Sequence, residues 1–264
     1  MLKRKRLVFT LGIVIVLGFL LVTFVRGKYV VPILMYHSVN PDATAKNRLA
    51  LTPVAFQRQM RFLKEHKYNV LPLEAAANLI KDKKKIPAKT VVITFDDGYK
   101  DNYTYAFPVL KKYNLPATIF IIINEVGRPQ QDRLSWDEIK AMQASGIITF
   151  GSHTLGPEPL VNIKSEIELR KEIFDAKKIL QEKLGSAVNI FSYPGGLFNE
   201  RIKNLVKEAG YKAAVVTNPG KRFPNDDIYA LKRLRISSSS NNLFVFWVES
   251  SGYYNFMRES RHKK

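Results

Sequence analysis

The sequence predicts an α/β protein: a distorted (β/α) barrel of about seven units, preceded by one N-terminal transmembrane helix. Short apolar segments alternate with helical patterns about seven times, which is typical of a parallel sheet. The alternation fills roughly 230 residues without an internal linker or repeat, a length that suits one closed barrel better than two domains. An uncharged apolar run near the N-terminus stands apart from this pattern.

The N-terminal segment is interpreted as a signal anchor. A basic stub over 1–6 precedes an uncharged apolar run of nineteen residues over 7–25. As a helix this run spans about 28 Å, close to the hydrocarbon thickness of a bilayer. Four Lys and Arg residues precede the run and only Arg26 and Lys28 follow it closely, so the positive-inside rule predicts a single-pass cell-membrane protein with 29–264 outside the cytoplasm. A cleaved signal peptide is the alternative.

The predicted strands are short apolar runs, and most of them end in polar residues. A strand buried on both faces reads as a continuous apolar segment, as expected in a parallel sheet covered by helices. The seven runs span 29–39, 90–95, 117–123, 147–153, 188–194, 211–217 and 229–237.

Helical patterns fill the segments between these strands. Thr52 is a suitable N-cap, with Pro53 at the first helical position. The longest helix begins after Ser165 and ends at Gly185. The segment over 103–114 is helical in pattern despite its proline. The other helical patterns lie over 72–87, 135–146, 199–210 and 241–252.

Composition narrows the classes of partner. The chain has no cysteine, which excludes disulfides and thiolate metal sites. Its 42 Lys and Arg residues against 23 Asp and Glu give a net charge of +19, which favours anionic partners. The basic residues form short scattered clusters, such as KDKKK at 81–85, without a nucleic-acid-binding signature around them, so no nucleic-acid partner is expected.

Polar side chains gather where the predicted strands end. His37 lies at the end of the first strand, Asp96 and Asp97 follow the second, and His153 ends the fourth. In a parallel barrel the carboxyl ends of the strands form the active site. Carboxylates and imidazoles are ordinary zinc ligands, and a metal-bound water needs a base to take its proton. If Gly98 lets the chain turn, one aspartate can hold a metal while the other serves the water.

Each of these residues also has a simpler explanation when it is taken alone. A histidine at a strand end is often only a hydrogen-bonded polar residue, and an Asp-Gly pair is a common turn whose aspartate can cap the following helix. The convergence of two aspartates and two histidines on one rim favours a site.

The motifs around these residues resemble a known family. TFDDGY, GSHT, SYPGG and SWDEI are similar to motifs of the polysaccharide deacetylases of carbohydrate esterase family 4, which have the NodB-homology fold. The resemblance runs from about Pro32 to the C-terminal region, so the domain is placed over 29–264, and TFDDGY is its most specific part. PILMYHSV and YALKRLRI resemble the permuted branch that includes poly-N-acetylglucosamine deacetylases.

The resemblance implies a role for each residue at the strand ends. Asp96 would be the general base and Asp97 a ligand of a divalent metal, with zinc expected. His153 would be the second ligand, and His37 would be the acid that protonates the leaving amine. Arg233 would orient the base from another strand, since many family members have an arginine for this role at the position of Ser192.

The resemblance also implies a substrate groove. Residues 193–196 would form its wall, with a backbone N–H near Tyr193 directed at the oxyanion. The residues expected to contact substrate are Tyr193, Pro194, Gly195 and Trp136.

One position departs from the family pattern. The family expects H-T-x-x-H-x-x-L, with a second histidine ligand, whereas this chain has HTLGPEPL with Pro157 at that position. Proline cannot bind a metal. Either Asp97 and His153 hold the metal with more water, or Glu158 substitutes as a ligand, or the metal is lost.

The expected function is therefore that of a membrane-anchored, extracytoplasmic polysaccharide deacetylase. It would hydrolyse N-acetyl groups of an amino-sugar polymer with the help of a metal. Because Pro157 replaces a ligand, the alternative is a catalytically impaired carbohydrate-binding protein on the same fold.

Overall fold

A computed structural model describes residues 12–20, 23–24, 26–27, 29–44, 46–47, 49–128, 132–217 and 225–254. The predicted stub over 1–6, part of the predicted anchor over 7–25 and the last ten residues of the predicted domain lie outside these ranges. Residues 12–20 are helical. In the part of the chain that is described, no helix has the length and apolar character needed to cross a bilayer.

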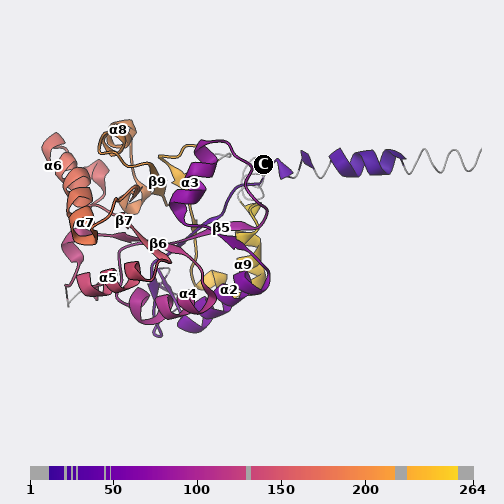
Figure 1. Ribbon diagram of the computed structural model, residues 1–264, viewed down its shortest axis with the longest axis horizontal. Coiled ribbons are helices and arrows are strands. Elements are labelled where there is room, and N and C mark those ends of the chain that lie inside the picture. The colour runs from indigo at the N-terminus through magenta and orange to yellow at the C-terminus, as the bar shows by residue number, and fades with distance from the viewer. Residues whose placement is uncertain are drawn as a thin grey trace, which may run out of the picture.

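The centre of the fold is a parallel sheet rolled into a nearly closed barrel and surrounded by helices (Figure 1). Its strand order is β10-β9-β8-β7-β6-β5-β1-β11, and every pair in this order is parallel. The strands are β1 (Ile33–Tyr36), β5 (Thr90–Phe95), β6 (Ala117–Ile121), β7 (Ile148–Ser152), β8 (Ile190–Ser192), β9 (Ala213–Val216), β10 (Leu231–Lys232) and β11 (Leu234–Arg235).

The barrel closes at Arg233. Strand β10 pairs with β9 through Leu231 and Val215, and β11 pairs with β1 through Leu234 and Leu34. Only Arg233 separates β10 from β11, so one stretch of chain joins the two edges of the sheet. With β10 and β11 taken as one predicted strand, the barrel has the expected seven units.

Three short strands supplement the barrel. β2 (Ser38–Val39) pairs with β3 (Ala50–Leu51), and β4 (Asn69–Val70) pairs with β5. The first predicted strand is therefore interrupted at His37, between β1 and β2. Sequence periodicity did not indicate β3 or β4, which have only two residues each.

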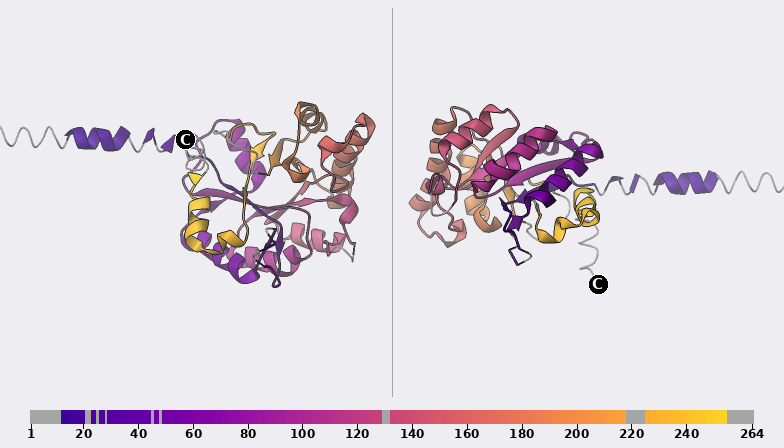
Figure 2. Two further views of the ribbon diagram at one scale, coloured as in Figure 1. Left: turned by 180° about the vertical axis from the view of Figure 1, so that it is seen from behind. Right: turned by 90° about the horizontal axis from the view of Figure 1, so that it is seen from below.

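The helices largely begin and end where the sequence predicts. The side chains of Thr52, Ser135 and Ser165 accept the expected N-cap hydrogen bonds, and Gly185 ends its helix in the left-handed conformation. The α-helices are α2 (Pro53–Glu65), α3 (Leu73–Lys81), α4 (Phe107–Tyr113), α5 (Trp136–Ala144), α6 (Glu166–Arg170), α7 (Ala176–Leu184), α8 (Glu200–Glu208) and α9 (Leu243–Ser250). Figure 2 shows α9 beside the point where the chain enters the barrel, and the N–H of Val30 donates to the carbonyl of Gly252.

Two predicted helices contain π-helical segments. One segment, η5 (Lys171–Asp175), joins α6 to α7 within the predicted helix over 165–185. The other, η1 (Asn102–Ala106), precedes α4. It leaves Pro108 in the first turn of α4, where a missing N–H removes no helical hydrogen bond.

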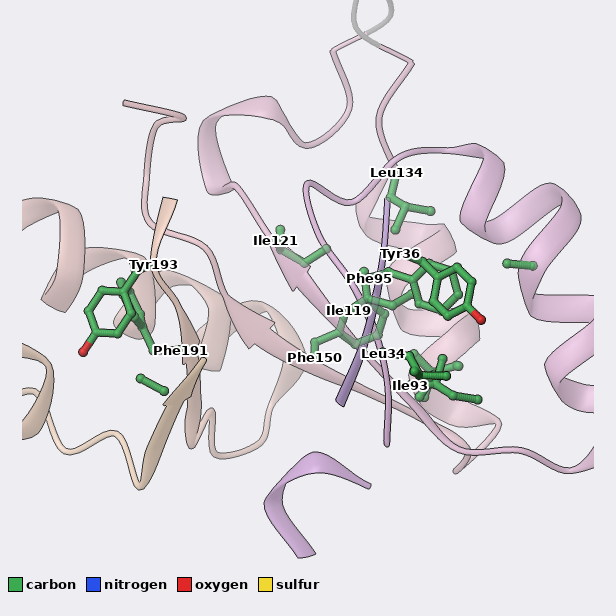
Figure 3. Close-up of a cluster of buried hydrophobic side chains, with 14 of the residues drawn as sticks. Leu34, Tyr36, Ile93, Phe95, Ile119, Ile121, Leu134, Phe150, Phe191 and Tyr193 are labelled. Carbon is green, nitrogen blue, oxygen red and sulfur yellow. The ribbon is translucent and has the colours of Figure 1, made fainter. Parts of the chain in front are cut away.

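Two apolar clusters fill the structure. The larger one joins the sheet to the helices and includes Leu34, Ile93, Phe95 and Ile119 (Figure 3). The smaller one takes alternate strand positions, including Val92, Phe120 and Val215. Alternation along a strand sends these residues to the other face, which is the barrel interior. The side chains at the carboxyl ends of the strands therefore rest on a packed apolar core.

Candidate active site

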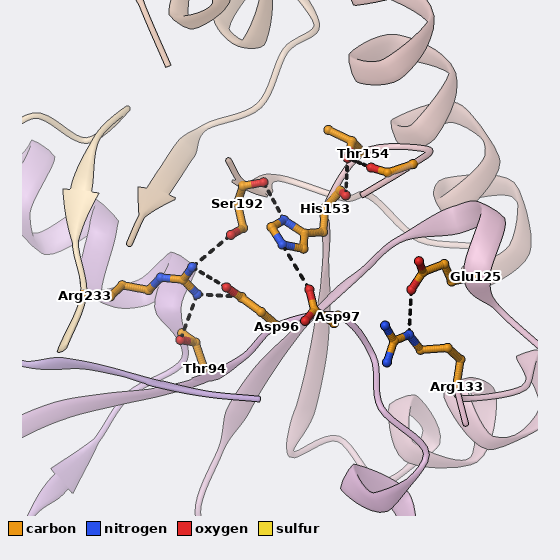
Figure 4. Close-up of polar contacts among 10 residues, drawn as sticks. Thr94, Asp96, Asp97, Glu125, Arg133, His153, Thr154, Ser192 and Arg233 are labelled. Carbon is orange, nitrogen blue, oxygen red and sulfur yellow. Dashed lines mark hydrogen bonds and ion pairs between the residues drawn. The ribbon is translucent and has the colours of Figure 1, made fainter. Parts of the chain in front are cut away.

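The structure brings the predicted catalytic residues to one end of the barrel. All six residues of β5 are buried, and Asp96 and Asp97 follow directly at its carboxyl end. His153 follows β7 at the same end. Figure 4 shows both aspartates with His153 and Arg233, so side chains from three separate strands meet here.

The two aspartates diverge because the chain turns sharply after β5. Asp97 has a φ of 69° and Gly98 a φ of 63°, both in the left-handed region. A Cβ atom at Gly98 would lie 2.9 Å from Cδ1 of Ile121, which would have to move, and the positive φ of Gly98 itself disfavours other residues. The turn directs Asp96 toward Arg233 and Asp97 toward His153 (Figure 4).

Arg233 holds Asp96 in a bidentate ion pair. Nη1 donates to Oδ1 at 2.7 Å, and Nη2 donates to Oδ2 at 2.6 Å. The remaining guanidinium N–H groups donate to the Thr94 hydroxyl, the Ser192 hydroxyl and the carbonyl of Val216. All five donors of the guanidinium are thus used, which fixes its plane and the carboxylate that it holds.

The ion pair keeps Asp96 charged. Burial alone would raise the pKa of this carboxyl, which is 3% exposed, but the charge and hydrogen bonds of Arg233 lower its pKa to about 2. A carboxylate offers about four lone-pair positions, and Arg233 occupies two of them. The other two are available to accept a proton from a water molecule.

His153 and Asp97 form a second pair, in which a ring nitrogen of the histidine faces a carboxylate oxygen of the aspartate. Nδ1 of His153 donates to the carbonyl of Ser192 at 2.8 Å, because a carbonyl oxygen can only accept. Nε2 is thereby directed at Oδ1 of Asp97, 3.4 Å away. Burial lowers the pKa of His153, but Asp97 and Asp96 raise it above the ordinary value.

This pair fits part of a metal site. A carbonyl that fixes the Nδ1–H of a histidine is a common support for a metal ligand, since it leaves Nε2 free to bind. The two carboxylates provide the negative charge that a cation would neutralise. Asp97 and His153 therefore supply two of the three protein donors usual for a catalytic zinc.

The third donor is missing from the described residues. Pro157 is exposed, and Glu158 is also exposed, with its carboxylate bonded to the side-chain amide of Asn162. Throughout the ranges that the structure describes, no three His, Cys, Asp or Glu side chains come together to hold a metal. The structure does not support the predicted alternative in which Glu158 substitutes, because local bonding directs its side chain elsewhere.

Glu172 fixes the loop that carries Pro157. Its Oε2 accepts from the N–H groups of Leu155 and Gly156, both at 2.9 Å. Thr154, directly after His153, has a φ of 69°. The backbone next to the presumed ligand is thus held in an unusual conformation, as is common near functional groups. Sequence reasoning did not identify Glu172, which lies in the π-helical segment η5.

His37 lies at the break between β1 and β2. Its Nδ1 is buried and has no hydrogen-bond partner within the described part of the chain. Burial lowers the pKa of His37 below its ordinary value, although the nearby charges of Asp96 and Asp97 act in the opposite direction. The N–H of Asp96 donates to the carbonyl of Tyr36 at 3.0 Å, which places His37 beside the two aspartates.

Asp101 and Asn102 hold the segment that carries His37. Nδ2 of Asn102 donates to the carbonyl of His37 at 2.8 Å. Asp101 accepts from the N–H of Val39 at 3.0 Å and from the hydroxyl of Ser38. Sequence reasoning missed both residues. The available signal was their position just after TFDDGY, where two polar residues open a helical pattern and become buried.

The structure corrects the predicted groove wall. The Tyr193 side chain is fully buried, and its hydroxyl donates to the carbonyl of Tyr229 at 3.0 Å. Its backbone N–H donates to the carbonyl of Val215 in the sheet. The buried ring gives no support to the predicted substrate contact at Tyr193, and the N–H of Tyr193 itself is not free to contact an oxyanion. Pro194 is buried too, whereas Gly195 is exposed.

Trp136 packs on the core at the start of α5. It lies under the ammonium of Lys183, 5.7 Å from its ring centre. Its ring contacts Lys183 of α7, so it helps to hold α5 against α7. The predicted substrate contact at Trp136 gains no support from this placement.

The fold and the strand-end site define a class of protein, and the chain belongs to the polysaccharide deacetylase family. The family model matches residues 83–214, half of the chain. This segment contains both aspartates and His153, so the family assignment rests on the same residues as the site.

Two relatives and two solved structures extend the similarity. The chain is 37% identical over 221 residues to YxkH of Bacillus subtilis (strain 168), assigned to the polysaccharide deacetylases, covering 83% of this chain and 76% of YxkH. It is 31% identical to the poly-beta-1,6-N-acetyl-D-glucosamine N-deacetylase of Staphylococcus aureus (strain MSSA476), covering 70% and 67%. The structure of the Streptococcus pyogenes deacetylase PplD in complex with acetate superimposes with a TM-score of 0.73 at 28% identity, covering 82% and 97%. IcaB from Ammonifex degensii gives 0.74 at 26% identity, covering 84% and 97%.

Proposed function

We propose that this chain is a metal-dependent N-deacetylase that acts on a polymer of N-acetylated amino sugars outside the cytoplasm. One observation carries the proposal: a charged, Arg-bound carboxylate at Asp96 stands directly beside the facing donors of Asp97 and His153. Hydrolysis of an amide needs a base for water and an acid for the amine, and His37 stands in the same cluster.

Each residue has a defined task in this proposal. Asp96 accepts the proton of the attacking water at a lone pair that Arg233 leaves open. His37 gives a proton to the nitrogen of the amide as its bond to the acetyl carbon breaks. Arg233 positions Asp96 and does not contact the substrate, because all its donors are used within the protein.

Asp97 and His153 would hold the divalent metal, with zinc as the first candidate. When bound, such a metal acidifies a water molecule and polarises the acetyl oxygen. In the neutral imidazole of His153 the Ser192 carbonyl holds the proton on Nδ1 and leaves Nε2 to bind the metal, and the two aspartates supply opposite charge.

The comparison with the Staphylococcus aureus protein supports a β-1,6-linked N-acetylglucosamine polymer as the first substrate to test. Acetate release should be measured from β-1,6-linked oligosaccharides, chitin-type oligosaccharides and peptidoglycan fragments, with zinc, cobalt or nickel added. We expect acetate from at least one of them, and at least a hundredfold less from Asp96→Asn. Absence of acetate from all three with every metal would refute the enzyme proposal.

A second candidate is a carbohydrate-binding protein without turnover. The missing third donor favours it, since a zinc with two protein ligands is weakly held. Oligosaccharide binding that persists with no acetate release at any zinc concentration would establish this alternative.

We propose further that residues 7–25 anchor the domain to the outer side of the cytoplasmic membrane. The uncharged apolar run and the basic residues before it support this orientation. Protease added to intact spheroplasts should digest the domain. Full protection would contradict the proposed orientation, and a shortened mature protein in the medium would indicate cleavage instead.

A further inference from the structure

A strongly basic surface lies at the end of the barrel opposite the aspartates. The segment that joins α3 to β5 enters the barrel at the amino end of β5, whereas Asp96 follows its carboxyl end. Lys67 lies beside this segment, because Nζ of Lys89 donates to the carbonyl of the preceding residue, His66, at 3.1 Å. All six lysines of this surface are exposed, and we call them the basic floor: Lys67, Lys81, Lys83, Lys84, Lys85 and Lys89.

The basic floor contains little compensating charge. Among the residues that the structure describes, Lys84 is the one floor lysine in an ion pair with a carboxylate, that of Asp82 at 3.0 Å. Cations on α6 and α8 are paired, as in the bonds of Arg170 to Glu208 and of Arg201 to Glu166. The floor therefore presents a concentrated positive charge to solvent.

Three floor lysines occupy backbone positions that suit glycine better. Lys67, Lys83 and Lys89 have φ values of 55°, 51° and 57°. The left-handed region costs an L-residue about 1–2 kcal/mol, and glycine or asparagine usually fills it. Lys89 gains one hydrogen bond there, to the carbonyl of His66, whereas Lys67 and Lys83 are exposed, so backbone preference does not account for lysine at these two positions.

A pocket adjoins the basic floor where the chain arrives from the N-terminal segment. It has a volume of about 560 Å³, and its lining includes Arg26, Lys84, Lys85, Tyr29 and Tyr253. The two tyrosine rings meet edge to face at 5.7 Å. Tyrosines beside basic residues suit the headgroup region of a bilayer, where the rings are amphipathic and the phosphates are anionic.

We propose that the basic floor and this pocket bind the phosphate groups of an anionic phospholipid surface. Each lysine near such a surface strengthens binding by about fivefold at physiological salt. Figure 1 shows the helix at residues 12–20 pointing away from the barrel, and Arg26 and Tyr29 line one pocket with Lys84 and Lys85, so the N-terminal segment arrives beside the floor. The inference concerns a face that the deacetylase chemistry does not use.

This orientation has a consequence for the substrate, which rests on the proposed deacetylase function. The chain runs from Tyr29 at the floor to His37 at the rim. Eight residues at about 3.3 Å each span at most roughly 26 Å, and the tilt of the barrel strands shortens the height of His37 above the floor to about 20 Å. The site then faces away from the membrane and suits a polymer strand beyond the headgroups, not a sugar attached to a lipid.

The test measures lysine reactivity in the full chain on vesicles. The protein is incorporated into vesicles of phosphatidylcholine alone or of phosphatidylcholine mixed with phosphatidylglycerol, and its amines are acetylated and quantified by mass spectrometry. Labelling of Lys83, Lys84 and Lys85 should fall several-fold in the anionic vesicles. It should recover in 1 M salt, where the screening length is about 3 Å. Lys46 and Lys164, exposed in loops at the rim end, are the matched controls and should not change.

A paired variant tests the role of the charge. Lys67→Gly and Lys83→Gly together remove two charges at positions where glycine is the better backbone fit, so they should not lower the melting temperature. They should weaken the protection of Lys84 and Lys85 by phosphatidylglycerol. Undiminished protection in this variant would overturn the proposal.

Lipid binding by the basic floor can be distinguished from the proposed membrane anchor and from the proposed deacetylase activity. Equal labelling in the two kinds of vesicle would overturn it even if the protein stays anchored. Equal protection by soluble polyphosphate over phosphatidylcholine vesicles would also overturn it, because the ligand would then be a polyanion and not a lipid surface. The protein could be released by salt after phosphatidylglycerol has protected the floor lysines from labelling. That result would reject the membrane anchor and support lipid binding by the basic floor. Acetate release from soluble oligosaccharides tests the deacetylase independently.

Discussion

The two aspartates after β5 are neighbours in sequence, but their surroundings differ. Asp96 is enclosed, and both its oxygens contact an arginine whose five donors are all used. Asp97 faces a single imidazole nitrogen at 3.4 Å, and no third ligand joins them in the described ranges. The half of the site around Asp96, which would accept the proton, thus has all its contacts in place. The half around Asp97 and His153, which would hold the metal, lacks one protein ligand among the described residues. Metal affinity should therefore limit activity.

The largest expected effect is the loss of acetate release when Asp96 is replaced. Asp96→Asn should lose 10²–10⁴-fold or more in acetate release, because it removes the base. Zinc retention should not change, since Asp97 and His153 remain. The measurement is turnover together with metal content, and Asp97→Ala, which should lose both, is the control. An Asp96→Asn variant as active as the parent would show that the comparison assigns the base wrongly.

His37→Ala should also slow turnover by about 10²–10⁴-fold, while zinc binding remains, because the leaving amine loses its acid. Asn102→Ala is the matched variant. It frees the backbone carbonyl of His37 without removing the ring, so its effect should be smaller. Turnover measured at saturating zinc distinguishes the two, and equal losses in both variants would point to a structural role for His37.

The third prediction concerns stability. Arg233→Met should lower the free energy of unfolding by about 3–5 kcal/mol, because it leaves the Asp96 charge buried without a partner. In the double variant with Asp96→Asn both charges are gone, and much of this loss should be recovered. Denaturant unfolding of both single variants and the double variant measures the coupling. Additive losses would mean that the pair does not interact as its geometry indicates.

The sequence was sufficient to predict the barrel and the convergence of its polar residues. Apolar runs that end at His37, at Asp96 and at His153 identify strand ends, and parallel strands bring those ends together. Gly98 after two aspartates indicated the turn that separates them, which the left-handed φ values of Asp97 and Gly98 confirm. These features depend on local residue types.

The features that could not be predicted depend on long-range contacts. Burial of the Tyr193 ring follows from its packing on Phe198, and the direction of Glu158 follows from its bond to Asn162. The closure of the barrel at Arg233 depends on pairing between strands far apart in the sequence. The family resemblance implied only that Arg233 orients Asp96. The five hydrogen bonds of its guanidinium depend on residues that the fold brings together.

A smaller effect comes from a buried carboxylate, that of Glu249, which forms no ion pair with any of the described residues. Glu249 on α9 is 7% exposed, and burial raises its pKa to about 7, although a hydrogen bond with Ser240 acts to lower it. Because the folded pKa exceeds the unfolded value of 4.5, its contribution to stability is complete below pH 4.5 and is lost as the pH rises through about 7. The loss amounts to about 3 kcal/mol.

Glu249→Gln should remove this part of the pH dependence. Thermal unfolding of the parent and the variant between pH 4 and 8 measures it: the two curves should run together near pH 4 and separate as the pH rises, with the parent less stable at pH 7–8. Parallel curves would show that Glu249 does not stay protonated. Asp96, which is buried as deeply but paired with Arg233, shows the opposite pKa direction.

The most direct test of the account is zinc affinity, measured by competition with a chelator in the parent, Pro157→His and Glu158→Gln. The account predicts weak binding in the parent and activity that rises with added zinc. Pro157→His should bind at least about 10-fold more tightly, because it can restore a third donor. Glu158→Gln should change neither the parent nor the Pro157→His variant. Tight, stoichiometric zinc in the parent that survives Glu158→Gln would contradict the two-donor site.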